Sequence, residues 1–351
     1  MSLTRRRALL ALLAPAVSAA ALCVSGCPAP SSGGGETPQT GRGDDVPSRA
    51  EANPKKLVFG FVPSTEANKI AEDAKPMADF ISKEVGLTVE TFTSTDYVGL
   101  VEAMGSGKVD IGSLPPLAYV LAKDQNAADV LLKTSRQGSL TYHSMFVARA
   151  GSGITSVEQA KGKRMAFVDA SSASGYLFPA AYLKNKLGAD PDTYFSNVTF
   201  AGAHDRAVEA VYNGDVDVAA VYDDARNKVE KNGIKDVKQK VVKIGQTDEI
   251  PNDTIAVRAT LDPALAKKIQ AALLKYAASP DGKKTLFDVY EVDALKEAQD
   301  SDYDPVRKVA QDMGVQLSMF DKSKKAAVSA SPGAVPSPSA SPAAMATPGK
   351  P

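Results

Sequence analysis

Short apolar segments alternate with helical segments along most of the chain, and this alternation limits the possible folds more than any other feature. Segments with the apolar, β-branched composition of strands are Lys56–Val62, Leu87–Phe92, Val109–Leu114, Val130–Lys133, Arg164–Val168, Val198–Ala201, Val216–Val221 and Thr254–Arg258. Helices are predicted at Pro76–Glu84, Thr95–Met104, after Pro115-Pro116, and at Gly175–Leu187, Asp205–Tyr212 and Ala225–Lys231. Strands separated by helices are typical of mostly parallel sheets flanked by helices, an α/β fold.

One helix–strand unit occurs twice in the sequence. Val101–Gly112 and Val208–Ala219 are identical at six of twelve aligned positions, and in each a Gly ends a helix before a strand that passes through Val-Asp. The repeat fits two similar α/β lobes, one before about residue 142 and one after it. A chance match between two ordinary helix–strand units is the alternative.

The charge balance excludes one large class of proteins. The 351 residues are enough for about two domains of roughly 150 residues each. Lys+Arg and Asp+Glu both total 41, and a net charge of zero argues against a strongly basic nucleic-acid-binding protein. This zero is an average, because the first 27 residues hold Arg5, Arg6 and Arg7 and no acid, which leaves 38 basic against 41 acidic residues.

Cysteine and histidine are scarce. The two cysteines are Cys23 and Cys27, so a disulfide, a cysteine zinc site and a cysteine nucleophile are excluded in the rest of the chain. The two histidines, His143 and His204, are too few for a His-rich metal cluster. We therefore expect no metal and no cofactor.

The N-terminus has the composition of an export signal. Three arginines precede the apolar run Ala8–Val24, which is short for a membrane-spanning helix. Val24-Ser25-Gly26-Cys27 resembles a bacterial lipobox, so residues 1–27 are predicted to be a signal peptide and Cys27 the lipidated first residue of an extracytoplasmic protein. A simple signal anchor with an incidental cysteine is the alternative.

Low-complexity segments border the expected folded body, Lys55–Asp321. Residues 28–54 are rich in Pro, Ser and Gly and are predicted to be a flexible tether, and residues 322–351 an Ala/Ser/Pro-rich disordered tail. No apolar run in the body is long enough to cross a membrane.

The stretch Phe167–Pro179 is the most informative candidate site. A buried strand ends at Val168, and small hydroxyl residues lead into a helix that Pro179 places near Ser174 or Gly175. Free backbone N–H groups at a helix start attract anions, and Ser172 and Ser174 add hydroxyl donors. Gly175 is expected to let a ligand approach closely. An ordinary capped helix is the alternative.

Other polar residues also follow strands. His204-Asp205 opens a helix, Tyr222-Asp223-Asp224 follows the strand Val216–Val221, and Ile250–Asp253 precedes another strand. A helix cap, a surface position or a turn is the alternative explanation for each of these. Because ligands gather at the carboxyl ends of strands in open α/β sheets, a shared site is nevertheless expected. Tyr97, Tyr119 and Tyr142 are candidates to line a cleft, or else half-buried packing residues.

At these residues the sequence resembles the phosphonate-, phosphite- and phosphate-binding proteins of ABC importers. The resemblance covers nearly all of Leu57–Leu317. Its motifs are Phe59–Pro63, Pro76-Met77, Asp96-Tyr97, Tyr142–Arg149, Ala160–Lys163, Ala166–Asp169, Ser171–Gly175, Gly202–Asp205 and Ile250–Asp253.

The resemblance implies a two-lobed, venus-flytrap fold of the periplasmic-binding-protein type, with the ligand between the lobes. We expect lobe 1 at 55–142 and 245–321, and lobe 2 at 143–244. In the family a hydroxyl-rich loop grips the phosphonate oxygens, a role that falls here on Ser172, Ser174 and the backbone of Ala173. The family usually has Thr where this chain has Ala173, so one hydroxyl donor is missing.

The resemblance also suggests roles for residues outside that loop. The family histidine corresponds to His204, and tyrosines of the first lobe correspond to Tyr97 and Tyr142. Relatives that take aminophosphonates hold the ammonium group with acids, for which the candidate positions are Asp223 or Asp224, and Asp253. Asp253 could instead accept a proton from a protonated oxyanion.

Taken as a member of this family, the chain is expected to be a monomeric lipoprotein that captures the oxyanion by lobe closure and delivers it to an ABC permease. Two alternatives are a ligand sensor that docks on a membrane signalling receptor, and a hydrolase that uses Ser174 or His204. No Gly-x-Ser-x-Gly motif is present, and adjacent His204 and Asp205 side chains do not normally act as base and orienting partner. We therefore expect a binding protein without catalytic activity.

Overall fold

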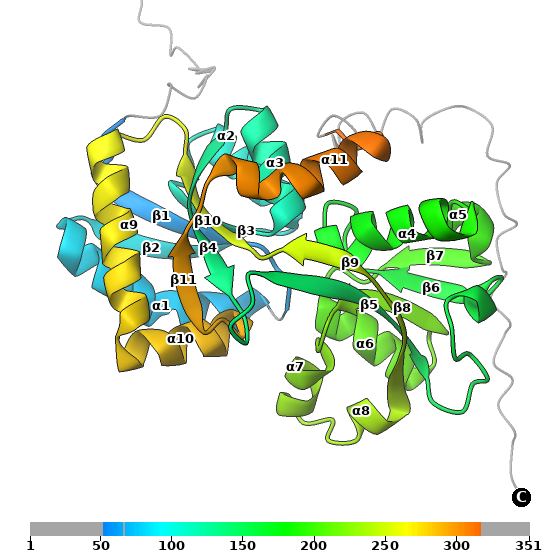
Figure 1. Cartoon of the computed structure of the whole chain (residues 1–351). Helices are drawn as coiled ribbons and strands as arrows, with labels where there is room; N and C mark the ends of the chain where they lie inside the picture. Colours follow the sequence, from blue (N-terminus) through cyan, green and yellow to red (C-terminus); the bar gives the residue numbers. More distant parts are fainter. Residues whose placement is uncertain (1–51, 66, 317–351) are drawn as a thin grey trace, which may run out of the picture. The chain divides into compact units, whose positions relative to one another are not determined.

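The computed structural model describes residues 52–65 and 67–316, which belong to one compact unit (Figure 1). The strands are β1 Lys56–Phe61, β2 Thr88–Thr93, β3 Ile111–Leu114, β4 Ala128–Ser135, β5 Thr141–Arg149, β6 Arg164–Phe167, β7 Asn197–Phe200, β8 Val218–Tyr222, β9 Val241–Pro251, β10 Thr254–Arg258 and β11 Ala294–Glu297. The expected signal peptide, Cys27, most of the tether and the tail at 322–351 lie outside the described residues.

Helices connect most of the strands. They are α1 Ala67–Val85, α2 Tyr97–Gly105, α3 Pro116–Asp124, η1 Glu158–Ala160, η2 Ala173–Leu177, α4 Phe178–Leu187, α5 Pro191–Tyr194, α6 His204–Asn213, α7 Arg226–Lys231, α8 Val237–Lys240, α9 Pro263–Ala278, α10 Pro280–Tyr290, η3 Asp300–Tyr303 and α11 Asp304–Asp312. Within 52–65 and 67–316, no helix is long and apolar enough to cross a membrane.

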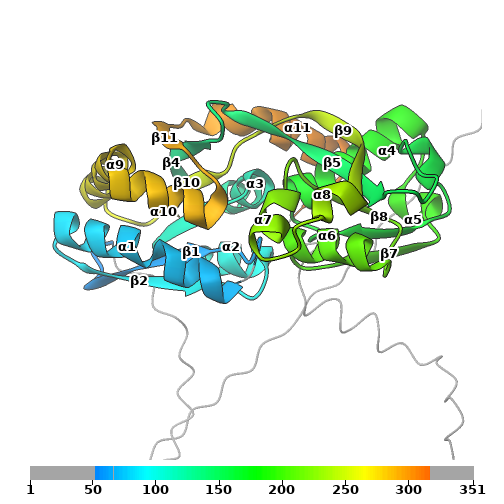
Figure 2. The same ribbon diagram turned by 90° about the horizontal axis from the view of Figure 1, so that it is seen from below.

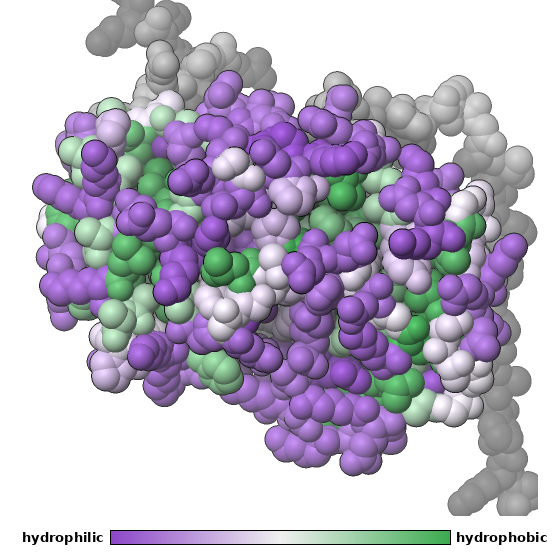
Figure 3. All heavy atoms as spheres, viewed as in Figure 1, coloured by the Kyte–Doolittle hydropathy of each residue, from purple (hydrophilic) through white to green (hydrophobic). Residues whose placement is uncertain are grey.

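Figure 3 shows one face of the molecule. Hydrophilic residues predominate on it, and hydrophobic residues form small separate patches.

Two sheets with matching strand order form the framework. The first has the order β11-β4-β10-β3-β1-β2 and the second β7-β6-β8-β5-β9. In each, three parallel strands (β2, β1, β3 and β7, β6, β8) are followed by an antiparallel one, β10 or β5. The α/β class is therefore confirmed, and both sheets are mixed. The repeated helix–strand units predicted from sequence end in β3 and β8, which hold equivalent places.

Each sheet is covered by helices on both faces. In the first sheet, Leu57, Phe59 and Phe61 of β1 pack against α1, α9 and α10, while α2 and α3 cover the opposite face (Figures 1 and 2). In the second sheet, Phe167 faces α4 and α5, whereas Val168 belongs to the core shared with α6 and α7. Because successive side chains of an extended segment point to opposite faces of the sheet, neighbouring residues contribute to the cores on both faces.

The chain crosses between the sheets twice, once between β4 and β5 and once between β9 and β10. The first crossing is a tight turn in which the backbone N–H and C=O groups of Arg136 and Ser139 form two hydrogen bonds of 2.9 Å. Gln137 and Gly138 have φ values of 52° and 77°, as a type I′ hairpin turn requires. All of β9 pairs with β5. The expected lobe boundary at 244/245 falls inside β9. The division of the chain into lobes stays a prediction.

The Asn252 side chain helps to hold the second crossing to the first. The Asn252 amide donates to the carbonyl oxygens of Thr134 at 3.2 Å and Ser139 at 2.9 Å. The Tyr303 hydroxyl donates to the Asn252 carbonyl at 3.1 Å. Tyr303 also packs edge-on against Tyr119, whose hydroxyl donates to Asp300 at 2.7 Å. Tyr119 is therefore a packing residue that joins α3 to η3.

Two helix starts differ from the sequence prediction. Pro76 lies inside α1 instead of in its first turn. The helix tolerates the lost N–H because one face packs into the core through residues such as Ile70 and Ile81. Asp96, and not Thr95, caps α2, where its carboxylate accepts a hydrogen bond from the Gly99 N–H at 2.7 Å.

We predict that Asn252→Ala lowers the free energy of unfolding by about 1–3 kcal/mol, because two backbone carbonyls lose a buried donor. Urea titration measures this change. Asn197→Ala, at an exposed position of β7, is the control and should leave stability within about 0.5 kcal/mol of the wild type. Equal effects of the two substitutions would contradict the proposed role of Asn252.

Candidate functional site

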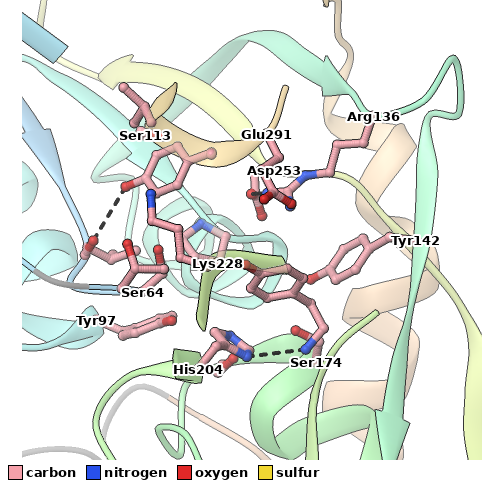
Figure 4. A pocket seen from close by; sticks show the side chains of 17 residues that line it. Ser64, Tyr97, Ser113, Arg136, Tyr142, Ser174, His204, Lys228, Asp253 and Glu291 are labelled. Carbon is pink, nitrogen blue, oxygen red and sulfur yellow. Dashed lines mark hydrogen bonds and ion pairs between the residues drawn. The ribbon is translucent and has the colours of Figure 1, made fainter. Parts of the chain in front are cut away.

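A small cavity lies where the carboxyl ends of strands from both sheets meet, and we call it the inner cavity (Figure 4). It measures about 40 Å³, counted as space for the centre of a water-sized sphere, and on this scale one water needs roughly 10–15 Å³. Its lining residues are Val62, Ser64, Thr65, Tyr97, Ser113, Pro115, Arg136, Tyr142, Ser172, Ser174, His204, Tyr222, Lys228, Asp253, Val289, Tyr290 and Glu291. Six of the nine ligand-binding residues predicted from sequence are among them.

The loop after β6 brings Ser172 and Ser174 to the cavity. Ser172 caps η2, with its Oγ accepting a hydrogen bond from the Gly175 N–H at 3.0 Å. The Leu177 N–H donates to the Ser172 carbonyl, and the Phe178 N–H to the Ala173 carbonyl, which is the spacing of a π turn. The helical structure therefore begins at Ala173, slightly earlier than predicted.

Gly175 and Ala173 are buried, and neither lines the inner cavity. A Cβ on Gly175 would lie 2.4 Å from the Val168 Cβ, so glycine is needed there for close packing of the helix start on β6. Ala173 is fully buried and does not belong to the residues that line the cavity. The Ser144 hydroxyl holds the Ser174 carbonyl at 2.6 Å, which orients the peptide beside the cavity.

His204 is a neutral hydrogen-bond donor. Its Nδ1 accepts a hydrogen bond from the Tyr222 N–H at 3.2 Å, so the ring proton resides on Nε2. Burial, with a smaller contribution from the charge of Arg136, lowers the pKa of His204 to about 3. The Asp205 carboxylate accepts a hydrogen bond from the Arg206 N–H at 2.9 Å, so it interacts with the backbone at the start of α6. A Ser–His–Asp arrangement is not formed.

Two tyrosines contribute hydroxyl groups from different parts of the cavity wall. The Tyr97 side chain is 1% exposed, and its hydroxyl has no hydrogen-bond partner among the described residues. Burial raises the pKa of Tyr97 well above its usual value, so the hydroxyl keeps its proton. Burial also raises the pKa of Tyr142, whose hydroxyl interacts with the Ser174 side chain. Both are neutral donors at physiological pH.

Arg136 and Asp253 form an ion pair at the two sheet crossings. The guanidinium Nη2 lies 2.8 Å from Asp253 Oδ2, and the two side chains are only 19% and 18% exposed. The guanidinium carbon lies 5.4 Å from the Tyr222 ring centroid and 6.0 Å from that of Tyr142. Burial raises the pKa of Asp253, and the charge of Arg136 opposes this shift.

Arg136 and Lys228 are cavity residues that the sequence analysis missed. The turn signal Gln137-Gly138 directly after a strand could have placed Arg136 at a strand end. No comparable local signal marks Lys228, because its position depends on α7 meeting a distant helix. Together these two cations balance Asp253 and Glu291, so the ionisable side chains of the wall sum to no net charge.

Asp223 and Asp224 do not reach the inner cavity. They line an adjoining outer cavity of about 650 Å³, whose walls include Glu230, Glu249 and Asp293 and which shares Arg136, Tyr142 and Glu291 with the inner one. The Asp223 N–H donates to the His143 carbonyl at 2.9 Å, and burial raises the pKa of the Asp223 carboxyl. Asp224 lies beside Arg226, with 3.8 Å between carboxylate and guanidinium. Both therefore line a different cavity from Asp253, and their role in binding an ammonium group stays a prediction.

In the part of the chain that the structure describes, no group of three or more His, Cys, Asp or Glu side chains is arranged to hold a metal ion. The inner cavity instead combines hydroxyl groups, one neutral imidazole, a guanidinium paired with Asp253 and the ammonium group of Lys228. Such a set can hydrogen-bond several oxygens of a tetrahedral oxyanion without a basic patch.

Known proteins show the same fold and a related sequence. The family model described as "ABC transporter, phosphonate, periplasmic substrate-binding protein" matches residues 59–303. The phosphate-import protein PhnD of Mycolicibacterium smegmatis is 28% identical over 319 residues, which cover 85% of this chain and 94% of that protein. The phosphonates-binding periplasmic protein of Escherichia coli is 29% identical over 247 residues, covering 68% and 72%. A crystal structure of a binding-protein component of an ABC phosphonate transporter from Pseudomonas aeruginosa superposes with a TM-score of 0.68 at 26% identity, covering 73% and 86%.

We predict that the His204 imidazole makes the protein less stable in acid. Its pKa of about 3 in the folded protein is below its usual 6.5, so the unfolded chain binds more protons between these values. Stability is therefore lost as the pH falls from 6.5 towards 3, by up to about 1.4 kcal/mol per pH unit from this group.

Urea unfolding at pH 7 and pH 5 would measure the effect as a difference between the wild type and His204→Asn. The buried carboxyls are common to both proteins and largely cancel in this difference. The wild type should lose more stability on acidification than the variant. Equal losses would show that His204 already titrates near its usual pKa in the folded protein.

Proposed function

The chain belongs to the family of periplasmic substrate-binding proteins of phosphonate ABC transporters, and from this premise we propose that it binds a phosphonate- or phosphate-type oxyanion in the inner cavity and delivers it to an ABC permease. Family membership places its work outside the cytoplasm and in transport, and the family is not one of enzymes. The identity of the ligand, its binding in the inner cavity and its delivery to the permease are what we propose.

The unpartnered hydroxyl of Tyr97 carries the proposal for the site. A buried donor without a partner costs about 1–3 kcal/mol, and an oxygen of a bound anion would remove that cost. Ser172, Ser174 and the Nε2–H of His204 come from the opposite sheet and border the same space. Donors from both sheets would then meet one anion, as a ligand held between two lobes requires.

The size and charge of the inner cavity favour a small oxyanion with at most a short substituent. Its 40 Å³ leaves little room beyond a tetrahedral head group. Asp253 is paired with Arg136, and the other candidate acids, Asp223 and Asp224, lie in the outer cavity. We therefore propose phosphate, phosphite or methylphosphonate ahead of an aminophosphonate.

Isothermal titration with these three anions and 2-aminoethylphosphonate tests the proposal, with sulfate as the control anion. At least one of the phosphorus oxyanions should bind in the micromolar range or tighter. Absence of binding by all four would refute the proposed ligand class.

We predict that Tyr97→Phe weakens binding of that anion about tenfold, because the variant removes one hydrogen bond to it. The melting temperature of the ligand-free protein should not fall, because the lost hydroxyl has no partner among the described residues. Tyr119→Phe is the matched control, since its hydroxyl bonds to Asp300 outside the cavity. Unchanged affinity in Tyr97→Phe would contradict the proposed seat of the anion.

We also propose that the protein is held at a membrane by a lipid on Cys27, on the basis of the lipobox-like Val24–Cys27. In a bacterial host, labelled fatty acid should be incorporated into the wild type and into Cys23→Ser. Cys27→Ser should take up no label. The only other thiol of the sequence, Cys23, lies four residues upstream, inside the expected signal peptide. Labelling of the Cys27→Ser protein would refute the anchor.

A further inference from the structure

We propose that Lys228 is a positioning residue that joins the end of α10 to α7 and so keeps the inner cavity closed around its ligand. This inference rests on the proposed binding function. It concerns how long the bound anion is retained, which is separate from which groups contact it.

Lys228 reaches from one half of the molecule to the other. It lies on α7, which packs through Val229 into the core with α6 of the second sheet. Its Nζ donates to the backbone carbonyl of Asp288 at 3.2 Å, and Asp288 lies in the last turn of α10, a helix of the first sheet. A single lysine thus connects helices that belong to different sheets.

The end of α10 is chemically suited to receive a cation. The last carbonyls of a helix lack partners within the helix and carry partial negative charge. Lys231 lies one turn after Lys228, and its Nζ lies 3.2 Å from Asp288 Oδ1 and 5.6 Å from the Phe287 ring centroid. Two lysines at i and i+3 therefore face the same helix end.

Lys228 is the more deeply placed of the two. The residue is only 5% exposed, and burial lowers the pKa of its ammonium group. A buried ammonium is costly unless it is hydrogen-bonded, and the acceptor of the Lys228 hydrogen bond belongs to the opposite half. Separation of the halves would leave this cation to water, whereas closure gives it the carbonyl of Asp288.

The contact acts on residues that line the cavity. Val289, Tyr290 and Glu291 follow Asp288 directly, and all three form part of the inner wall. Figure 4 shows Glu291 there. The Tyr290 hydroxyl lies 3.4 Å from the Val62 carbonyl, so the same segment is also tied to the end of β1. Holding Asp288 therefore fixes one side of the cavity against the other.

Stopped-flow binding of inorganic phosphate or methylphosphonate, whichever the wild type binds, tests the proposal on the full chain. Lys228→Met keeps the aliphatic stem and removes the charge. The dissociation rate should rise about tenfold, the worth of one charge-assisted hydrogen bond, and the association rate should stay within about threefold. Lys228→Arg retains a donor and should restore slow dissociation to within about threefold of the wild type.

Lys235→Met is the matched control, because the Lys235 Nζ also donates to a backbone carbonyl, that of Glu230, but within the same half. It should leave both rates unchanged. If Lys228→Met fails to fold, Lys231→Met tests the same helix contact and should raise the dissociation rate about threefold.

Unchanged dissociation in Lys228→Met, or an equal rise in Lys235→Met, would overturn the proposal. A loss confined to the association rate would also overturn it, because that result indicates long-range attraction of the anion instead of closure. Failure of the wild type to bind any phosphorus oxyanion would refute the proposed function itself, and is thereby distinguishable from failure of the Lys228 contact alone.

Discussion

The ion pair between Arg136 and Asp253 joins the two points at which the chain passes from one sheet to the other. Because both residues also border the inner cavity, the same interaction that ties the crossings together sets the wall of the site. Loss of one partner would leave a nearly buried charge without compensation, at a cost of about 3–5 kcal/mol.

The site is electrically balanced before any ligand enters. Two cations face two carboxylates, and the remaining polar groups are hydroxyls and a neutral imidazole. His204 stays neutral because burial and the neighbouring guanidinium disfavour a further cation, and the Tyr222 N–H then selects its tautomer. Recognition of an anion in this electrically balanced cavity depends on fixed dipoles. Their interaction with the anion becomes stronger as water is excluded.

The sequence is informative where chemistry follows local pattern. The strand ends predicted from apolar runs and turn residues lead to Ser172, Ser174 and His204, because a parallel sheet brings such ends to one edge. A local pattern does not show which cavity a residue faces, because that depends on distant partners. Asp223 and Asp224 follow a strand as expected, yet they face the outer cavity.

Lys228 illustrates the same limit from the other direction. It looks like an ordinary charged residue in a short helix, and only the approach of α10 makes it part of a cavity wall. Similarly, Arg136 gains its role from Asp253, more than one hundred residues away in the chain. Tertiary partners of this kind leave no local trace in composition or spacing.

The order of strands has a consequence for how the chain is assembled during synthesis. The second sheet is built from one continuous stretch, β5 to β9, so all its strands are available once Pro251 has been made. In the first sheet β10 lies between β3 and β4, and these strands cannot be joined until Arg258 has emerged. Until then the inner edge of β3 is open to pairing with other chains. The first sheet, whose strands β1 to β4 are made first, is thus the last to be completed.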